Sequence, residues 1–185
     1  METSKELINC QAQSLLTDLY ELTMAYAHWK SGTHTKEACF TLSFRKNPFN
    51  GGFAVFCGLN QVIEFLKNFH FRKEDLDYLS TLKARDGTDL FNDEFLKYLA
   101  SIKLELDVDC VPEGTIVFNH EPLLRIKGPI VQAQIIETAL LNFVSFSTLV
   151  ATKARRIKLA AEEMPVFEFG LRRAQGPDGG VTASL

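Results

Sequence analysis

The stretch from Ile130 to Glu163 limits what this chain can fold into more than any other part of the sequence. It is compatible with a helix throughout, and Pro129 suits the first helical position, where a backbone N–H is not needed. Because a helical pattern much longer than about 25 residues is unusual without a break, we expect two consecutive helices. The most apolar run, TALLNFVSFSTLVAT, is shorter than the roughly 20 residues that span a bilayer, so we expect it to form a buried helix.

A strand-like run and a glycine-rich segment follow this helical stretch. Pro165 ends the helix, and VFEF at 166–169 has the composition of a short, fully buried strand. The segment GLRRAQGPDGG then contains Arg172 and Arg173, whose forked donors suit phosphate or carboxylate oxygens. A helix, a buried strand and such a loop are typical of a β/α barrel, in which ligands bind at the C-terminal ends of the strands. A solvated turn with two surface arginines is the alternative.

The preceding part of the chain has an α+β pattern. Apolar residues recur on one side of a helix from Leu15 to Trp29, where Asp18 and Glu21 resemble a capping box and Gly32 suits the end. The other expected elements are a strand at 38–46, a strand at 53–57, a helix at 59–66, short helices at 74–82 and 93–100, and a strand at 104–110.

Two later segments, IVF and LLRIK, can return as antiparallel partners of the strand at 104–110. The fold class that we expect is therefore α/β. An N-terminal α/β domain would occupy residues 1–128, and residues 129–185 would form the helices, first strand and loop of an incomplete β/α barrel.

The charge and the cysteines of the chain exclude several kinds of partner. Its 20 basic and 23 acidic residues are mixed along the sequence and give a net charge of −3, so we expect neither nucleic acid nor membrane as a partner. The 4 cysteines are widely spaced without a C-x-x-C pair, which favours reduced thiols over a zinc site or a disulfide scaffold. Because the N-terminus also lacks the features of a secretory signal, we expect a cytoplasmic protein.

Residue chemistry alone offers two further candidate ligand contacts. Arg45 and Lys46 end a strand before the glycine turn NPFNGG and could contact phosphate, although a charged strand end is usually just solvated. Tyr20, in the first turn of its helix, could stack on a flat ring, although an aromatic residue beside an apolar stripe is more often part of the core. The cations at 153–158 are explained by the dipole at a helix C-terminus. The histidines and the aspartates of the strand at 104–110 receive no role.

Five segments, in order, resemble the nicotinate phosphoribosyltransferase family, and the resemblance extends from Leu15 to Ser184. They are LLTDLYELTMAYAHWKSG, FRKNPFNGGFAVFCGL, VPEGTIVF, VSFSTLVATKA and GLRRAQGPDGGVTAS. The resemblance implies an N-terminal α/β domain and an irregular β/α barrel of the type II phosphoribosyltransferase kind, assembled as a dimer with shared active sites. It also implies the joining of nicotinate to phosphoribosyl pyrophosphate in NAD salvage, with magnesium required and ATP hydrolysis coupled to the turnover.

The same resemblance implies substrate-binding roles for five residues. Phe169 resembles the aromatic residue that stacks on one face of the pyridine ring, and Tyr20 resembles the one that the partner subunit places on the other face. Arg172 resembles an arginine near the nicotinate and phosphoribosyl groups. Arg45 and, less closely, Lys46 resemble basic residues that reach phosphate across the dimer. Charge-assisted contacts of this kind would orient the pyrophosphate leaving group.

No catalytic residue and no metal ligand is expected in this chain, because the resemblance places the histidine that the family phosphorylates from ATP beyond Leu185. A lone strand at 166–169 would lack its barrel neighbours, so we expect the chain to be inactive alone and to need a second copy or a complementing C-terminal half. Two alternatives stay open. One is a non-catalytic remnant that dimerises with a full-length homologue, and the other is a phosphoribosyltransferase for nicotinamide or quinolinate.

Overall fold

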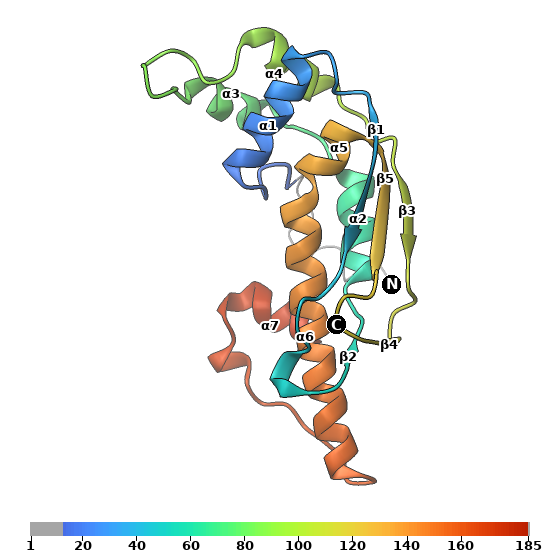
Figure 1. Cartoon of the computed structure of the whole chain (residues 1–185). Coiled ribbons are helices and arrows are strands. Elements are labelled where there is room, and N and C mark those ends of the chain that lie inside the picture. The colour runs from blue at the N-terminus through green and yellow to red at the C-terminus, as the bar shows by residue number, and fades with distance from the viewer. Residues whose placement is uncertain (1–12, 185) are drawn as a thin grey trace.

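The structure is a computed structural model and describes residues 13–184. Its helices are α1 (Leu19–Lys30), α2 (Leu59–Asn68), α3 (Lys73–Thr81), α4 (Asp93–Ser101), α5 (Ile130–Ile135), α6 (Glu137–Ala161) and α7 (Gly176–Ser184), with short 3₁₀ turns η1 (Pro48–Asn50) and η2 (Leu171–Arg173). Its strands are β1 (Glu37–Leu42), β2 (Ala54–Val55), β3 (Asp107–Cys110), β4 (Ile116–Val117) and β5 (Leu124–Pro129). The long helix α6 runs down the molecule, with the main sheet beside its first half and α1, α3 and α4 gathered at one end (Figure 1).

This mixture of helices and sheet confirms the predicted α/β class. The expected helices at 59–66, 74–82 and 93–100 are present as α2, α3 and α4. The expected pair of consecutive helices is also confirmed, since Ile136 separates α5 from α6. Between residues 13 and 184, the structure contains no helix with the length and apolar character needed to cross a membrane.

Helix α1 begins and ends where the sequence predicts, but without the predicted capping box. Asp18 is the N-cap residue, and its side chain makes no capping hydrogen bond. The buried Glu21 carboxylate turns inward instead and accepts hydrogen bonds from the hydroxyls of Thr17 and Thr138. It is therefore not free to reach back to the start of the helix. At the other end, Gly32 has a φ of 70°, the left-handed conformation that ends many helices.

The main sheet is antiparallel, with β5 between β1 and β3. The register of β1 against β5 places Phe40 opposite Ile126. Along β5, Leu124 and Ile126 are buried whereas Arg125 and Lys127 are exposed. This alternation is expected of a sheet that packs one face on the core.

The segment IVF does not return to the strand at 104–110 as predicted, but forms β4 against β2. The Phe56 N–H donates to the Thr115 carbonyl at 2.9 Å, and the Gly114 N–H donates to the Phe56 carbonyl at 2.9 Å. These bonds hold the PEGT turn beside β2 and away from the main sheet. The prediction is right only for LLRIK, which forms most of β5 and pairs with β3.

Two threonines of α6 complete the hydrogen bonding of β2 and the residues after it. Thr152 Oγ1 accepts from the Val55 N–H at 2.8 Å, and Thr148 Oγ1 accepts from the Cys57 N–H at 3.1 Å. Both threonines are buried, and their spacing of four residues puts them on one side of the helix. The helix thus takes the place of a neighbouring strand, which gives a structural reason for the segment VSFSTLVATKA.

The N-terminus of α2 is capped by a residue that is distant in sequence. The Glu113 carboxylate accepts hydrogen bonds from the N–H groups of Gly58, at 2.8 Å, and Leu59, at 2.7 Å. A carboxylate is favoured there by the helix dipole and by the unbonded N–H groups. A Cβ atom at Gly58 would lie 2.8 Å from the carbonyl oxygen of Phe143 on α6, so glycine permits the close approach of the two helices.

An aromatic cluster joins α1 to α4. Phe95 on α4 is fully buried, and its ring lies 4.9 Å from that of Tyr26 and 5.7 Å from that of Trp29, both on α1. Phe91 and Tyr98 lie 5.5 Å and 6.1 Å from the same ring. Aromatic pairs at these separations are favourable beyond the area that they bury. The cluster therefore fixes α1, including its N-terminal turn, on the rest of the domain.

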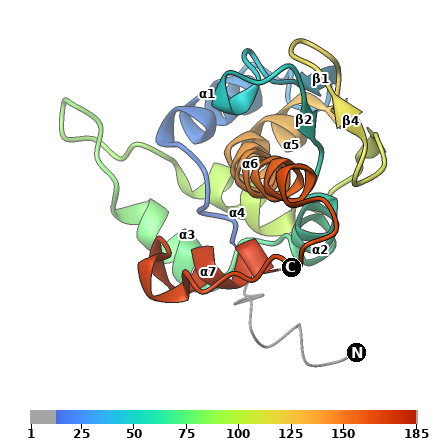
Figure 2. The same cartoon turned by 90° about the horizontal axis from the view of Figure 1, so that it is seen from below.

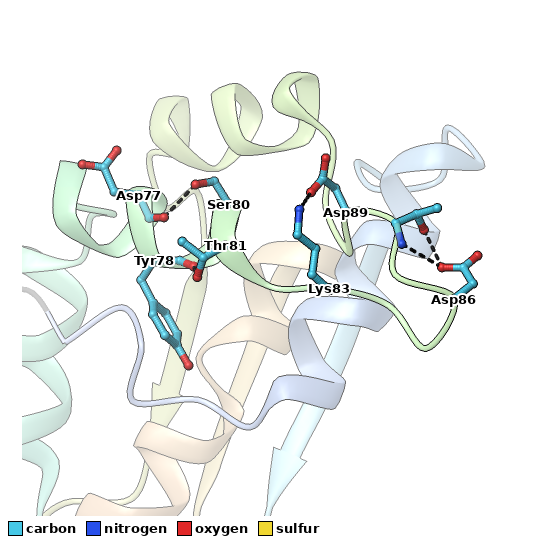
Figure 3. A network of polar contacts seen from close by, with 8 residues as sticks. Asp77, Tyr78, Ser80, Thr81, Lys83, Asp86 and Asp89 are labelled. Carbon is cyan, nitrogen blue, oxygen red and sulfur yellow. Dashed lines mark hydrogen bonds and ion pairs between the residues drawn. The ribbon is translucent and has the colours of Figure 1, made fainter.

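Polar contacts at the surface stabilise the turn in the segment that connects α3 to α4 (Figure 3). Lys83 forms an ion pair with Asp89. Asp86 accepts hydrogen bonds from the N–H of Thr88 at 3.0 Å and from its hydroxyl at 2.7 Å, and these bonds lower the pKa of Asp86. Because all of these groups are exposed, they shape the turn and contribute little to stability.

A buried carboxylate, Asp75, ties the segment before α1 to α3. It accepts hydrogen bonds from the Ser14 hydroxyl at 2.9 Å and from the Arg72 N–H at 3.0 Å, and it pairs with the Arg72 guanidinium at 2.9 Å. The hydrogen bond from the Arg72 side chain is the main reason why the pKa of Asp75 lies below its usual 3.8. Folding therefore favours the ionised form of this group.

Asp75→Asn is expected to lower the free energy of unfolding at about pH 7 by about 1.5–3 kcal/mol, the range for hydrogen bonds to a charged group. Because the folded pKa lies below the unfolded value, this contribution is complete above 3.8 and is lost as the pH falls through the folded value. Urea unfolding of both proteins from about pH 7 to about pH 2 measures it, and their difference should shrink at the acidic end. Asp86→Asn, which changes an exposed carboxylate with a lowered pKa, should have a much smaller effect. Equal losses in the two variants would contradict the role of Asp75.

The segment after α6 differs from the prediction. Residues 166–169 form no strand, and Phe167 and Phe169 are 72% and 78% exposed. A strand needs a neighbour for its backbone N–H and C=O groups, and within the described residues none pairs with this segment. The glycine-rich segment is also more than a turn, because it contains η2 and α7. Pro177 and Asp178 lie in the first turn of α7, where both residue types are favourable.

Candidate substrate site

Tyr20 lies in the first turn of α1, as predicted, and is 49% exposed. Its hydroxyl is 3.4 Å from a carboxylate oxygen of Glu21. Partial burial and Coulomb repulsion from Glu137, Glu21 and Asp18 raise the pKa of Tyr20 above its usual 10.0. The residue therefore presents a neutral phenol and an exposed ring, which suits stacking on a flat ligand.

The loop at 45–53 is held against α6 by two contacts between cations and aromatic rings. The Lys153 ammonium lies 4.6 Å from the centre of the Phe49 ring, and the Arg156 guanidinium lies 5.0 Å from the centre of the Phe53 ring. Cations at such distances are attracted by the electrons of the ring face. The loop is thus tied to the same helix that holds β2.

This loop begins with Arg45 and Lys46, just after the end of β1, and both side chains are exposed. It contains two consecutive non-glycine residues with positive φ, Phe49 at 59° and Asn50 at 51°. Such conformations cost free energy and persist where surrounding contacts impose them. The contact between Phe49 and Lys153 is one such contact, so α6 helps to fix the loop that follows the two basic residues.

Gly51→Ala tests whether Arg156 holds this loop. A Cβ atom at Gly51 would lie 1.3 Å from a guanidinium nitrogen of Arg156, which must then move away from Phe53. Gly52→Ala is the matched control, because nothing lies within 4 Å of the added atom. By urea unfolding, the control should gain about 0.4–1 kcal/mol of stability. Gly51→Ala should lose most of that gain, since the ring contact contributes about 0.5–1 kcal/mol. Equal gains would contradict the contact.

An open, mainly apolar groove of about 410 Å³ lies between this loop and α6. Phe44 and Lys46 line it from the side of β1, and Phe146 and Leu149 line it from α6. Lys46 is the one charged side chain in the lining that the structure describes. The groove therefore offers an apolar wall with a single cation beside it.

Phe169 and Arg172 precede α7. Figure 2, which looks nearly along α6, shows β1 and β2 on one side of that helix and α7 on the opposite side. Phe169 and Arg172 are both exposed. Among residues 13–184, no hydrogen bond, ion pair or ring contact joins either of them to Tyr20, Arg45 or Lys46. Arg45 and Lys46 thus share one loop, and no described contact joins Tyr20, Phe169 or Arg172 to them.

Sequence reasoning missed the residues that support these side chains. Lys153 and Arg156 were attributed to the helix dipole, but they contact the loop at 45–53. The dipole explanation fits Lys158, whose ammonium donates to the Glu162 carbonyl at 2.8 Å, just after the end of α6. The sequence contained one signal of these contacts: two cations three residues apart in the helical stretch, and phenylalanines in the loop.

The described residues do not form a metal centre. Between residues 13 and 184, no three His, Cys, Asp or Glu side chains come together in a way that could hold a metal ion. Asp18, Glu21 and Glu137 all act on Tyr20, but they do not form such a group either.

Several known proteins are similar to this chain in sequence and fold. Residues 15–145 match the family model of the nicotinate phosphoribosyltransferase (NAPRTase) N-terminal domain. The chain is 47% identical, over 93% of its length, to a nicotinate phosphoribosyltransferase of Caenorhabditis elegans, and 44% identical, over 89%, to one of Bacillus subtilis. The solved structure of human nicotinic acid phosphoribosyltransferase matches 91% of the chain with a TM-score of 0.80 and 42% identity.

A second solved structure is similar at a lower level. Nicotinate-nucleotide pyrophosphorylase from Pyrococcus furiosus matches 88% of the chain with a TM-score of 0.60 and 26% identity. In all of these comparisons the chain spans only about a third of the relative: 30% of the C. elegans protein, 32% of the B. subtilis protein and 33% of each solved chain. Because the family model covers residues 15–145, most of the sequence, the chain belongs to the nicotinate phosphoribosyltransferase family.

Proposed function

We propose that this chain forms part of an enzyme that joins nicotinate to phosphoribosyl pyrophosphate in the salvage of NAD. The observation that carries the proposal is the loop at 45–53. Contacts with α6 hold this loop in place, while Arg45 and Lys46 at its start are exposed. Two neighbouring cations on a supported loop suit the phosphate groups of the second substrate. Membership of the family supports this choice of substrates.

In this proposal, Tyr20 and Phe169 contact the two faces of the pyridine ring. Both rings are exposed, and no described contact joins them within one chain. We therefore propose that a second copy of the chain places its Tyr20 opposite Phe169. Arg172, three residues after Phe169, would then contact the nicotinate or phosphoribosyl groups through charge-assisted hydrogen bonds.

The reaction is a displacement at C1 of the ribose. The pyridine nitrogen forms a bond to C1 while the bond from C1 to the pyrophosphate oxygen breaks, and pyrophosphate leaves with the electron pair. Arg45 and Lys46 would stabilise the negative charge that develops on the leaving group. Stacking of Tyr20 and Phe169 would hold the ring so that its nitrogen faces C1.

Magnesium and ATP are further requirements that we propose from family membership. Residues 13–184 hold no group of three or more His, Cys, Asp or Glu side chains that could bind a metal ion, and we name no residue among them as a ligand of magnesium. We assign no step at these residues to the ion or to ATP. We also propose a cytoplasmic location, where the free thiols of Cys39, Cys57 and Cys110 would stay reduced; Cys10 lies outside the described residues.

The test is product formation by the chain alone and by the chain mixed with the part of the C. elegans relative that it does not span. Each reaction contains nicotinate, phosphoribosyl pyrophosphate, magnesium and ATP, and mass spectrometry detects nicotinate mononucleotide. We expect no product from the chain alone and product from the mixture. No product from the mixture would contradict the proposal. If the chain then changed the rate of a full-length relative, the non-catalytic partner would be the better interpretation.

A further inference from the structure

The Tyr20 hydroxyl lies among carboxylates from two helices. Glu21 follows it on α1, with one carboxylate oxygen 3.4 Å from the phenol oxygen. Glu137 is the first residue of α6, and its pKa is raised by burial and by Coulomb repulsion from Glu21, while a hydrogen bond from Tyr20 opposes the rise. Asp18, the N-cap residue of α1, is the third carboxylate that acts on the phenol.

Glu21 occupies an unusual position for a carboxylate, because it is completely buried. Its described donors are hydroxyls: Thr17 donates to one oxygen, and Thr138, 117 residues away in the sequence, donates to the other at 2.8 Å. A buried charge held only by neutral donors is costly, and an apolar residue of similar size is often as stable at such a position. Stability alone therefore does not explain why a carboxylate occupies this position. Its contact with the Tyr20 hydroxyl offers a functional reason.

Thr138 connects this cluster to α6. Its hydroxyl lies 2.8 Å from Glu21 and 3.3 Å from Asp18, and it directly follows Glu137 in the sequence. A hydroxyl has one proton to donate, and the shorter contact assigns it to Glu21. The first turns of α1 and α6 are thus joined through the side chains that surround the phenol.

We propose that Glu21 and Glu137 are positioning residues: Glu21 accepts the Tyr20 hydroxyl proton in a hydrogen bond, Glu137 attracts the same proton through its charge, and together they fix the direction of the ring. The inference rests on the proposed function, in which Tyr20 stacks on the pyridine ring. A ring held by its hydroxyl loses less conformational freedom when the ligand binds.

The first test needs no enzyme activity. Tyrosine labelled with ¹³C at Cζ reports ionisation by NMR in the 185-residue chain, and Tyr20→Phe assigns the Tyr20 signal among the 4 tyrosines. We expect the midpoint of Tyr20 to lie above 10.0 and to move down toward that value in Glu137→Gln and in Glu21→Gln. Glu64→Gln on α2 is the control and should leave it unchanged. If Glu21→Gln does not fold, Glu137→Gln decides, and an unchanged midpoint in that variant overturns the inference.

The second test is kinetic and uses the chain assembled with the remaining part of the relative. Glu137→Gln removes the charge of this carboxylate but keeps an oxygen that can accept a hydrogen bond, so we expect the KM for nicotinate to rise about threefold to tenfold. The kcat and the KM for phosphoribosyl pyrophosphate should stay the same. A merely structural defect would instead reduce the active fraction of the enzyme and therefore lower kcat. An unchanged KM for nicotinate overturns the positioning role. If the unmodified assembly does not use nicotinate, the proposed function fails, while the NMR titration still decides whether the carboxylates act on Tyr20.

Discussion

Replacing Phe95 with alanine is expected to lower the free energy of unfolding by about 3–5 kcal/mol, the range for removing a phenyl ring from a core. The ring is completely buried and lies 4.9 Å from that of Tyr26 and 5.7 Å from that of Trp29. Few atoms could move to fill the space, because the neighbouring rings belong to α1, to α4 and to the segment just before α4, all of which pack on the cluster. The loss is large beside the roughly 5–15 kcal/mol that stabilises a typical domain.

Urea unfolding measures this effect, with the fluorescence of Trp29, the single tryptophan of the chain, as the signal. Tyr78→Ala is the control, because Tyr78 on α3 is 57% exposed and its removal should change stability by no more than about 0.5 kcal/mol. A loss below about 1 kcal/mol for Phe95→Ala would show that the cluster does not hold α1. The same experiment tests the support of Tyr20, which lies in the first turn of that helix.

Arg172→Ala, in the chain assembled with the remaining part of a relative, is expected to lower kcat/KM about tenfold to 150-fold. The loss of one charge-assisted hydrogen bond to a substrate costs about 1.5–3 kcal/mol, which corresponds to that range. The exposed position of Arg172 in η2, three residues after Phe169, leaves its guanidinium free to reach a ligand on the Phe169 ring.

Arg173→Ala is the matched control for this substitution, since Arg173 is the next residue of η2 and is also exposed. It should change kcat/KM by roughly twofold or less, as expected for an exposed cation without a ligand contact. Initial rates with nicotinate and phosphoribosyl pyrophosphate varied separately would show which substrate Arg172 contacts. Equal effects of the two substitutions, or unchanged rates for both, would contradict the assignment.

Local signals were sufficient to predict the helices from α1 to α6, but not α7, which lies in a segment expected to be a loop. Asp18 and Gly32 delimit α1, and the apolar pattern after Leu59 predicts α2. What local signals could not show was the partner of each backbone group. The cap of α2 comes from Glu113, and the hydrogen bonds of β2 are completed by Thr152, 97 residues from Val55.

The prediction of a strand at 166–169 was wrong for the same reason, because local signals do not show the partner of a backbone group. Its apolar composition indicates a strand that is buried on both sides, but composition does not supply the neighbours that a strand needs. In the described residues the segment is exposed and unpaired, so Phe167 and Phe169 lie open to solvent. A short apolar run is thus weaker evidence than a long periodic one, such as α6.

In the candidate site, too, the sequence indicated individual residues but not the distant residues that contact them. Tyr20, Arg45 and Lys46 were chosen from their types and their places at the ends of elements, and the structure confirms that all three are exposed; their roles stay predictions. Their supporting residues come from α6, which lies about a hundred residues further along the chain. No spacing rule connects Glu21 with Thr138, or the loop at 45–53 with the cations of α6.

The most direct measurement is a competition between two pyridine substrates for the assembled enzyme. Ring-deuterated nicotinate and unlabelled quinolinate are supplied in equal amounts with phosphoribosyl pyrophosphate, magnesium and ATP, and mass spectrometry reads the label in the mononucleotide product. Quinolinate would have to lose its second carboxyl group as carbon dioxide to give the same mononucleotide, so the label alone identifies the source. We expect the product to be deuterated. Unlabelled product would contradict the proposal that Tyr20, Phe169 and Arg172 belong to a site for nicotinate.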